Sequence, residues 1–139
     1  MNIVVIDGQS GRMGQLFIER AKNAGLTCPL LAVGTNSLAT AAMLKGGADE
    51  GATGENAVSF GAGRAHILLG PVGILAANGL LGEVTPRMAE AIGASEAVKI
   101  LLPSQRCSIR LAVGPAQPLQ YYLDDAMRLL DEEVRRLTA

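Results

Sequence analysis

The residues best suited to chemistry lie near the N-terminus, in the stretch VVIDGQSGRMG (residues 4–14). An apolar run leads into Asp7, and glycines follow at Gly8, Gly11 and Gly14. Glycines between a strand and a helix allow a tight turn and a close approach of the backbone to a phosphate, while the helix N-terminus offers free N–H groups. The pattern favours a phosphate-binding turn. Because the spacing is Gly-x-x-Gly-x-x-Gly and not Gly-x-Gly-x-x-Gly, a structural corner is the alternative.

Polar side chains within this turn extend the hypothesis. Ser10 can cap the helix or donate to a phosphate, and Arg12 can bind a phosphate or simply be solvated. Asp7 is expected to orient the turn by accepting backbone N–H bonds, with a ribose hydroxyl or a metal as the alternative partner. The turn residues predicted to contact a cofactor are Asp7, Gly8, Gln9, Ser10, Gly11, Arg12, Met13 and Gly14.

The ends of two further strands lie at the same predicted edge. A dinucleotide site usually carries an acidic residue about 20 residues after the glycines, where it binds the ribose. Thr35 and Asn36 occupy this position instead. Both can hydrogen-bond a ribose or a 2′-phosphate, so the choice between NAD and NADP stays open. Gly70 and Pro71, after another strand, complete the predicted site, because open α/β sheets bind ligands along this edge.

A glycine-rich stretch, GATGEN (residues 51–56), is a second candidate. Thr53, Glu55 and Asn56 lie in a predicted loop, where function concentrates. The loop could face the Gly8 turn and contact the ligand. Alternatively, Thr53 caps a helix that starts at Gly54.

Other reaction chemistry finds little support in the sequence. No Gly-Lys-Ser/Thr occurs, which excludes a P-loop, and neither Tyr121 nor Tyr122 is followed by a lysine four residues later. His66, the one histidine, is expected to be structural, and Cys28 and Cys107 are expected to be buried thiols. No metal site and no catalytic residue is predicted, and whether the protein is an enzyme stays open.

Periodicity and turn residues define the elements that position these groups. Apolar β-branched runs predict buried strands, and apolar residues three and four apart predict helices. Pro86 suits a helix start, with Thr85 as its cap. The expected strands are 2–6, 29–34, 66–70, 98–102 and 108–113, and the expected helices are 13–24, 38–45, 56–60, 72–82, 86–92 and 118–137.

Alternating strands and helices predict an α/β three-layer sandwich with a five-stranded, mainly parallel sheet, formed by one domain over residues 1–139. The segment between the strands 98–102 and 108–113 is too short for a parallel crossover, so 108–113 is expected as an antiparallel edge strand. The apolar stripe of the last helix predicts packing on the sheet. The alternative is part of a dimer seam, and a homodimer is favoured among oligomers.

The composition, with 49% hydrophobic and 18% charged residues, is typical of a folded globular domain. A formal net charge of −1 gives no electrostatic footprint for nucleic acid or an anionic membrane. The uncharged stretch 67–82 is too short to span a membrane, and the N-terminus lacks the basic region of a signal peptide. With only two cysteines, the chain is expected in the cytoplasm.

The stretch GQSGRMG resembles the nucleotide-binding turn of dihydrodipicolinate reductase, which carries Gly-Arg-Met-Gly before its first helix. That family adds a second domain with a His-His motif and a catalytic lysine, whereas this chain has one histidine and is expected to form a single domain. Nearly the whole chain resembles a family of short bacterial proteins classed as a domain of unknown function. This resemblance implies a Rossmann-like fold and no known reaction. Its motifs are IDGQSGRMG, GATGENA, GPVGIL, GEVTPRMAEAIGAS and RCSI.

Three functions are consistent with these patterns. The first is a protein that binds a nucleotide or dinucleotide through Gly8–Gly14 and senses it. The second is a small oxidoreductase that completes its site across a dimer, and the third is a ligand-free interaction module. The first predicts that Gly11→Val abolishes ligand binding while the fold survives.

Overall fold

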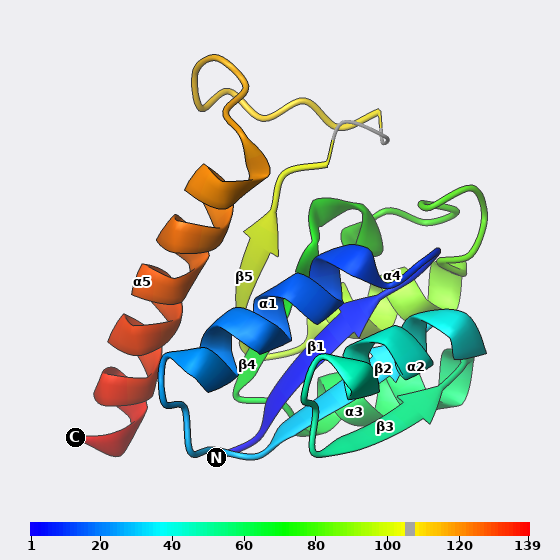
Figure 1. Cartoon of the computed structure of the whole chain (residues 1–139). Helices are drawn as coiled ribbons and strands as arrows, with labels where there is room; N and C mark the ends of the chain where they lie inside the picture. The colour runs from blue at the N-terminus through cyan, green and yellow to red at the C-terminus, as the bar shows by residue number, and fades with distance from the viewer. Residues whose placement is uncertain (105–107) are drawn as a thin grey trace.

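Five parallel strands form the centre of the structure, a computed structural model that describes residues 1–104 and 108–139 (Figure 1). In the order β3-β2-β1-β4-β5, every neighbouring pair is parallel. The predicted parallel sheet is therefore confirmed. The strands are β1 (Ile3–Asp7), β2 (Leu30–Gly34), β3 (Glu50–Thr53), β4 (Ile67–Pro71) and β5 (Val98–Leu102).

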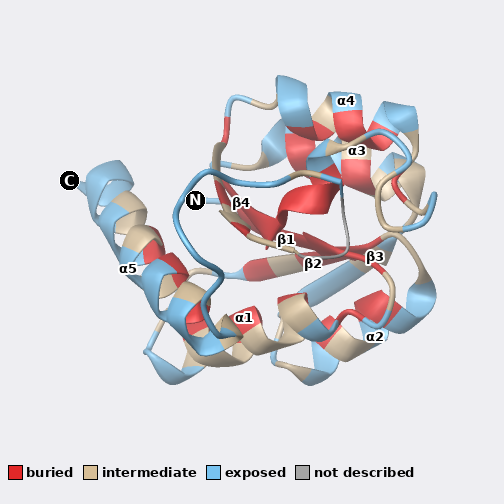
Figure 2. Cartoon of the chain, turned by 90° about the horizontal axis from the view of Figure 1, so that it is seen from above, coloured by how far each residue is buried: buried red, intermediate tan, exposed pale blue. Residues whose placement is uncertain are grey.

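Helices cover both faces of the sheet and complete the predicted three-layer α/β architecture (Figure 2). Helices α1, α2 and α5 pack on one face, and α3 and α4 pack on the other. The helices are α1 (Arg12–Asn23), α2 (Ser37–Lys45), α3 (Glu55–Arg64), the 3-10 turn η1 (Val72–Leu75), α4 (Pro86–Ala94) and α5 (Leu119–Thr138).

The buried β-branched run of β1 explains why the sheet is apolar on both faces. Side chains alternate along a strand, so Ile3 and Val5 enter the core under α1 and α5, while Val4 and Ile6 enter the core under α3 and α4. All five residues of β1 are buried. A central parallel strand of this kind is covered by helices on both sides.

The predicted antiparallel edge strand is wrong. Residues 108–113 form no strand, and Leu111 and Val113 are exposed. The edge strands are β5 and β3, although the sequence predicts a loop in place of β3. The sequence of β3, EGAT, has little apolar character, so its pairing with β2 determines its structure more than its side chains do.

A second correction concerns residues 72–82, which the sequence predicts as one helix. Only Val72–Leu75 form a helical turn, and a loop follows. Asn78, Leu80 and Leu81 have positive φ angles of 64°, 55° and 57°, which a right-handed helix cannot accommodate. Leu80 and Glu83 of this loop reach back to the first glycine turn.

The helix caps are only partly as predicted. Thr85 caps α4, since its hydroxyl accepts from Met88 N at 3.1 Å. Helix α1 has Gly11, not Ser10, at its N-cap, and Gly54 rather than Thr53 caps α3. Neither cap uses a side chain.

Helix α5 packs on the sheet, as its apolar stripe predicts. Leu123, Ala126 and Leu130 are buried, and the helix contacts β5 and α1. Leu137, at the far end of the stripe, is 37% exposed. Among the described residues, no helix combines the length and apolar character required to cross a membrane.

Candidate functional site

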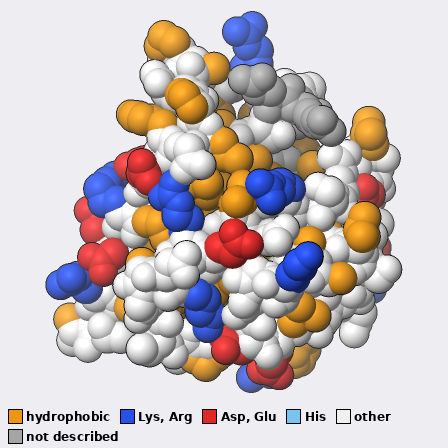
Figure 3. All heavy atoms as spheres, viewed as in Figure 1, with side chains coloured by type: hydrophobic (Ala, Val, Ile, Leu, Met, Phe, Trp, Pro, Cys, Tyr) orange, Lys and Arg blue, Asp and Glu red, His pale blue; other side chains and the backbone are white. Residues whose placement is uncertain are grey.

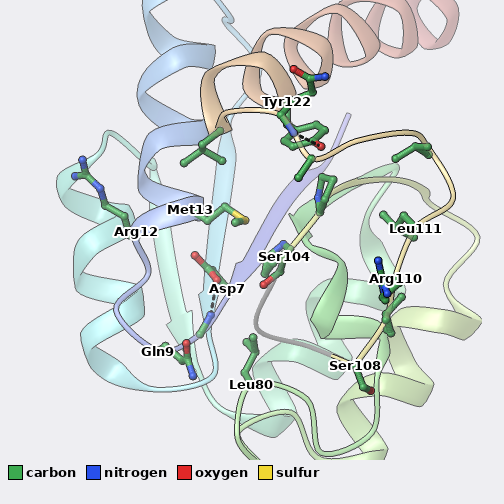
Figure 4. A pocket seen from close by; sticks show the side chains of 18 of the residues that line it. Asp7, Gln9, Arg12, Met13, Leu80, Ser104, Ser108, Arg110, Leu111 and Tyr122 are labelled. Carbon is green, nitrogen blue, oxygen red and sulfur yellow. Dashed lines mark hydrogen bonds between the residues drawn. The ribbon is translucent and has the colours of Figure 1, made fainter.

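A cavity of about 940 Å³ opens at the carboxyl end of the sheet, where the chain leaves β1 and β4 in opposite directions. The β1–α1 turn forms its floor, and the segment that leads to α5 forms its far wall (Figure 4). Such a reversal of strand order is where open α/β sheets bind ligands. The cavity is lined by Asp7, Gly8, Gln9, Ser10, Arg12, Met13, Pro71, Leu80, Pro103, Ser104, Ser108, Ile109, Arg110, Leu111, Val113, Gly114, Ala116, Gln117, Leu119 and Tyr122.

The Asp7 carboxylate lies at the base of this cavity and is only 4% exposed. It accepts hydrogen bonds from Gly8 N at 2.8 Å and from Gly14 N at 2.7 Å. One carboxylate therefore joins the end of β1 to the first turn of α1. This is the turn-orienting role that the sequence predicts for Asp7.

Burial raises the pKa of Asp7 above its usual value of 3.8, although the two backbone hydrogen bonds act in the opposite direction. The charge of nearby Glu83 raises it further. Because the folded pKa lies above the unfolded one, protonation of Asp7 contributes stability that is fully present below pH 3.8 and is lost as the pH rises through the folded pKa. The stability from the hydrogen bonds to Gly8 N and Gly14 N is a separate contribution.

A pH titration of stability checks this sign. We expect the free energy of unfolding of the wild type to exceed that of Asp7→Asn by more at acidic than at neutral pH, since the amide cannot titrate. Urea unfolding of both proteins at several pH values measures the difference. A gap that widens toward neutral pH would contradict the raised pKa.

Gly11 shows that the glycine spacing serves the protein's own packing. Its φ is +73°, in the left-handed region that favours glycine. A Cβ atom there would lie 2.6 Å from the carbonyl oxygen of Ala39 and 2.7 Å from Ala39 Cα. The residue therefore allows the start of α1 to pack against α2. We therefore expect a valine at this position to destabilise the fold, which differs from the expectation drawn from the sequence.

Part of the α1 N-terminus stays open toward the cavity. The N–H groups of Gly8, Gln9, Gly11 and Gly14 donate to protein acceptors. Within residues 1–104 and 108–139, no acceptor is found for the N–H groups of Ser10, Arg12 and Met13. Such groups, together with the positive end of the helix dipole, favour an anion.

Two arginines add positive charge to the cavity lining. Arg12 comes from the first turn of α1, and Arg110 comes from the segment before α5. In Figure 4 the Arg12 side chain points away from Asp7, and Arg110 lies on the opposite side of the cavity. Neither arginine has an ion-pair partner in the described part of the chain. The cavity can therefore attract an anionic group although a buried carboxylate lies at its base.

The remaining lining is mainly apolar. Met13, Leu111, Leu119 and Tyr122 contribute carbon surface, and the Tyr122 hydroxyl accepts from Gln117 N at 3.0 Å. Hydrophobic side chains gather at this end of the molecule, between α5 and the segment that follows β5 (Figure 3). Apolar walls with a few placed polar groups are typical of small-molecule sites.

Glu83, for which the sequence leaves a ligand contact and a local capping role open, lies at the turn. One of its oxygens, Oε1, accepts from Gln9 N, Thr35 Oγ1 and Asn36 Nδ2, each at 2.8 Å. Burial acts to raise the pKa of Glu83, but these hydrogen bonds outweigh it and hold the pKa below its usual value. Glu83 thus places a carboxylate at the end of β2, where the sequence lacks an acidic residue.

The GATGEN residues lie away from the cavity. The Thr53 hydroxyl lies 2.8 Å from that of Thr40, and Glu55 forms a 3.4 Å ion pair with Arg87. Thr53, Glu55 and Asn56 are all absent from the cavity lining. The predicted approach of this loop to the Gly8 turn is therefore not seen in the described residues.

His66 and Cys28 take no part in the cavity. His66 Nδ1 accepts from Asn2 N at 2.9 Å, which agrees with a structural role. Cys28 is half-buried rather than buried, and Cys107 lies outside the described residues. Among those residues no cluster of three or more histidine, cysteine or acidic side chains could hold a metal ion.

Comparison with known proteins places the chain in a family. No curated protein and no solved structure matches it. A family model described as Domain of unknown function (DUF3842) matches residues 2–135, which is nearly the whole chain. The protein therefore belongs to the DUF3842 family, as the motifs of its sequence predict.

Proposed function

We propose that this protein binds a phosphate-bearing nucleotide in the cavity at the carboxyl end of β1 and β4. The observation that carries the proposal is the position of the cavity, which coincides with the reversal of strand order and with the N-terminus of α1. In this proposal the phosphate lies at the N–H groups of Ser10, Arg12 and Met13, and the base and ribose occupy the apolar part.

The donor groups around the cavity suit a phosphate. Backbone N–H groups at a helix start bind phosphate without a charged side chain, and an arginine adds charge-assisted hydrogen bonds. Arg110 lies across the cavity from the turn and is exposed, so its side chain is free to reach a ligand. Binding is the proposed activity, and no reaction is assigned.

Replacement of Arg110 by glutamine tests this arrangement. A hydrogen bond to a charged group contributes about 1.5–3 kcal/mol, so the variant is expected to bind the phosphate about tenfold to a hundredfold more weakly. Isothermal titration with AMP, nicotinamide mononucleotide, NAD and NADP measures the affinities. Thermal shift by the same compounds gives an independent readout, because a ligand of the folded state raises the melting temperature.

Lys45→Gln is the matched control. Lys45 is an exposed cation at the end of α2, without an ion pair among the described residues, and it does not line the cavity. We expect this variant to bind as the wild type does. Equal losses of nucleotide affinity in Arg110→Gln and Lys45→Gln would indicate a general effect of the removed positive charge and not a contact made by Arg110. Absence of binding by every one of the four compounds would refute the proposed function.

A further inference from the structure

The two sides of the glycine turn differ in the space that they offer a ligand. On the side of β4, β5 and α5 lies the cavity of about 940 Å³. Among the described residues, none from β2, α2 or β3 lines it. The side toward β2 is filled by two side chains from the loop between η1 and α4, Leu80 and Glu83.

Gly8 shows how closely these side chains fill that side. A Cβ atom on Gly8 would lie 2.6 Å from Thr35 Oγ1, 2.8 Å from Leu80 Cδ1 and 3.0 Å from Glu83 Oε1. Even a methyl group would therefore collide with the neighbours of Gly8. The missing side chain at this position makes room for the protein's own atoms and not for a pyrophosphate.

Glu83 also uses the groups that would bind a second nucleoside. Its Oε1 accepts from Gln9 N in the turn and from the side chains of Thr35 and Asn36 at the end of β2. In the dinucleotide-binding mode these positions contact the pyrophosphate and the ribose. A carboxylate with a lowered pKa also repels a phosphate placed beside it.

The loop that carries both side chains is internally bonded. Asn78 N donates to Val84 O at 2.7 Å, Gly82 N to Asn78 O at 3.0 Å, and Val84 N to Gly79 O at 3.0 Å. Val84 is 1% exposed and anchors the loop in the core beneath α4. These bonds hold Leu80 and Glu83 against the turn.

We infer that the site takes a ligand of one nucleotide unit and does not bind a dinucleotide across the turn, an inference that rests on the proposed function. Leu80 forms the wall between the open and the filled side. The ligand's phosphate faces the start of α1 and Arg110, and its nucleoside lies near Met13, Leu111 and Tyr122. On the side toward β2, the second nucleoside of a dinucleotide has no corresponding space, because Leu80 and Glu83 fill it.

AMP and nicotinamide mononucleotide, the two halves of NAD, provide the test on the wild-type protein. We expect at least one mononucleotide to bind no more weakly than NAD in isothermal titration. NAD that binds about tenfold or more tightly than both halves would overturn the inference and leave the proposed function intact. Absence of binding by all three compounds, and by NADP, would refute the proposed function, and the inference with it.

The double variant Leu80→Ala, Glu83→Ala adds a second test, because it empties the filled side. Its affinity for NAD is expected to rise about tenfold relative to the affinity for the better mononucleotide. Glu90→Ala, a change at an exposed residue of α4 that does not line the cavity, is the control and should leave the ratio unchanged. An unchanged ratio in a folded double variant would contradict the inference. The wild-type comparison decides the question if the variant does not fold.

Discussion

Replacement of Gly11 by valine is expected to lower the free energy of unfolding by about 3–5 kcal/mol, a large part of the roughly 5–15 kcal/mol of a typical domain. A β-branched residue at a φ of +73° is strained by about 1–3 kcal/mol. Contact between its Cβ and the backbone of Ala39 adds an overpacking cost of about 1–3 kcal/mol. Urea unfolding followed by circular dichroism measures the loss.

Gly63→Val is the matched control for this prediction. Gly63 lies in α3, and a Cβ atom added to it would meet no other atom within 4 Å. Its φ also lies outside the left-handed region. The same substitution there is expected to change stability by no more than about 0.5 kcal/mol, because valine is a slightly better helix former than glycine. If Gly11→Val lowered the free energy of unfolding no more than Gly63→Val does, the close packing of the turn against α2 would be contradicted.

Replacement of Asp7 by alanine is the second large effect. The change leaves the N–H groups of Gly8 and Gly14 without their acceptor, and an unsatisfied buried donor costs about 1–3 kcal/mol. Removal of a buried charge offsets part of this cost, so we expect a net loss of about 2–4 kcal/mol at neutral pH. Urea unfolding gives the difference directly.

Asp131→Ala is the corresponding control, since Asp131 is an exposed partner of Arg135 on α5. An exposed i,i+4 pair contributes about 0.3–0.5 kcal/mol, so this variant should be nearly as stable as the wild type. If Asp7→Ala lowered the free energy of unfolding no more than Asp131→Ala does, the Asp7 carboxylate would not stabilise the turn.

Local patterns are sufficient to predict the strand, turn and helix at the base of the site. The apolar run of β1, the glycines and the helical spacing that follows them predict the strand, turn and helix in which Asp7 lies. The expectation that Asp7 accepts backbone N–H bonds needs no more than a carboxylate next to a tight turn. Interactions between neighbours in sequence are visible in the sequence itself.

Long-range contacts are not predictable in the same way. Glu83 is 74 residues from Gln9, and only the tertiary structure brings its carboxylate to the turn. The role of Gly11 depends on its distance from Ala39 on another helix. For the same reason the sequence does not predict β3, because its pairing with β2 replaces the apolar pattern that a strand normally shows.

Residues 108–113 illustrate the opposite error. Alternating Ile109, Leu111 and Val113 have the pattern of a strand, but no neighbouring strand pairs with them in the described residues. The segment lines the cavity instead. In this segment the alternating apolar residues therefore form a wall of the candidate site and not an edge strand of the sheet.

The central claim, that the cavity holds a nucleotide with its phosphate at the start of α1, is tested most directly by nuclear magnetic resonance. Titration of the ¹⁵N-labelled protein with AMP or nicotinamide mononucleotide should shift the amide signals of Ser10, Arg12 and Met13, together with those near Arg110. The signals of Thr53, Glu55 and Asn56 should stay in place. Saturable shifts confined to other parts of the chain, or no shifts with either compound, would contradict the account.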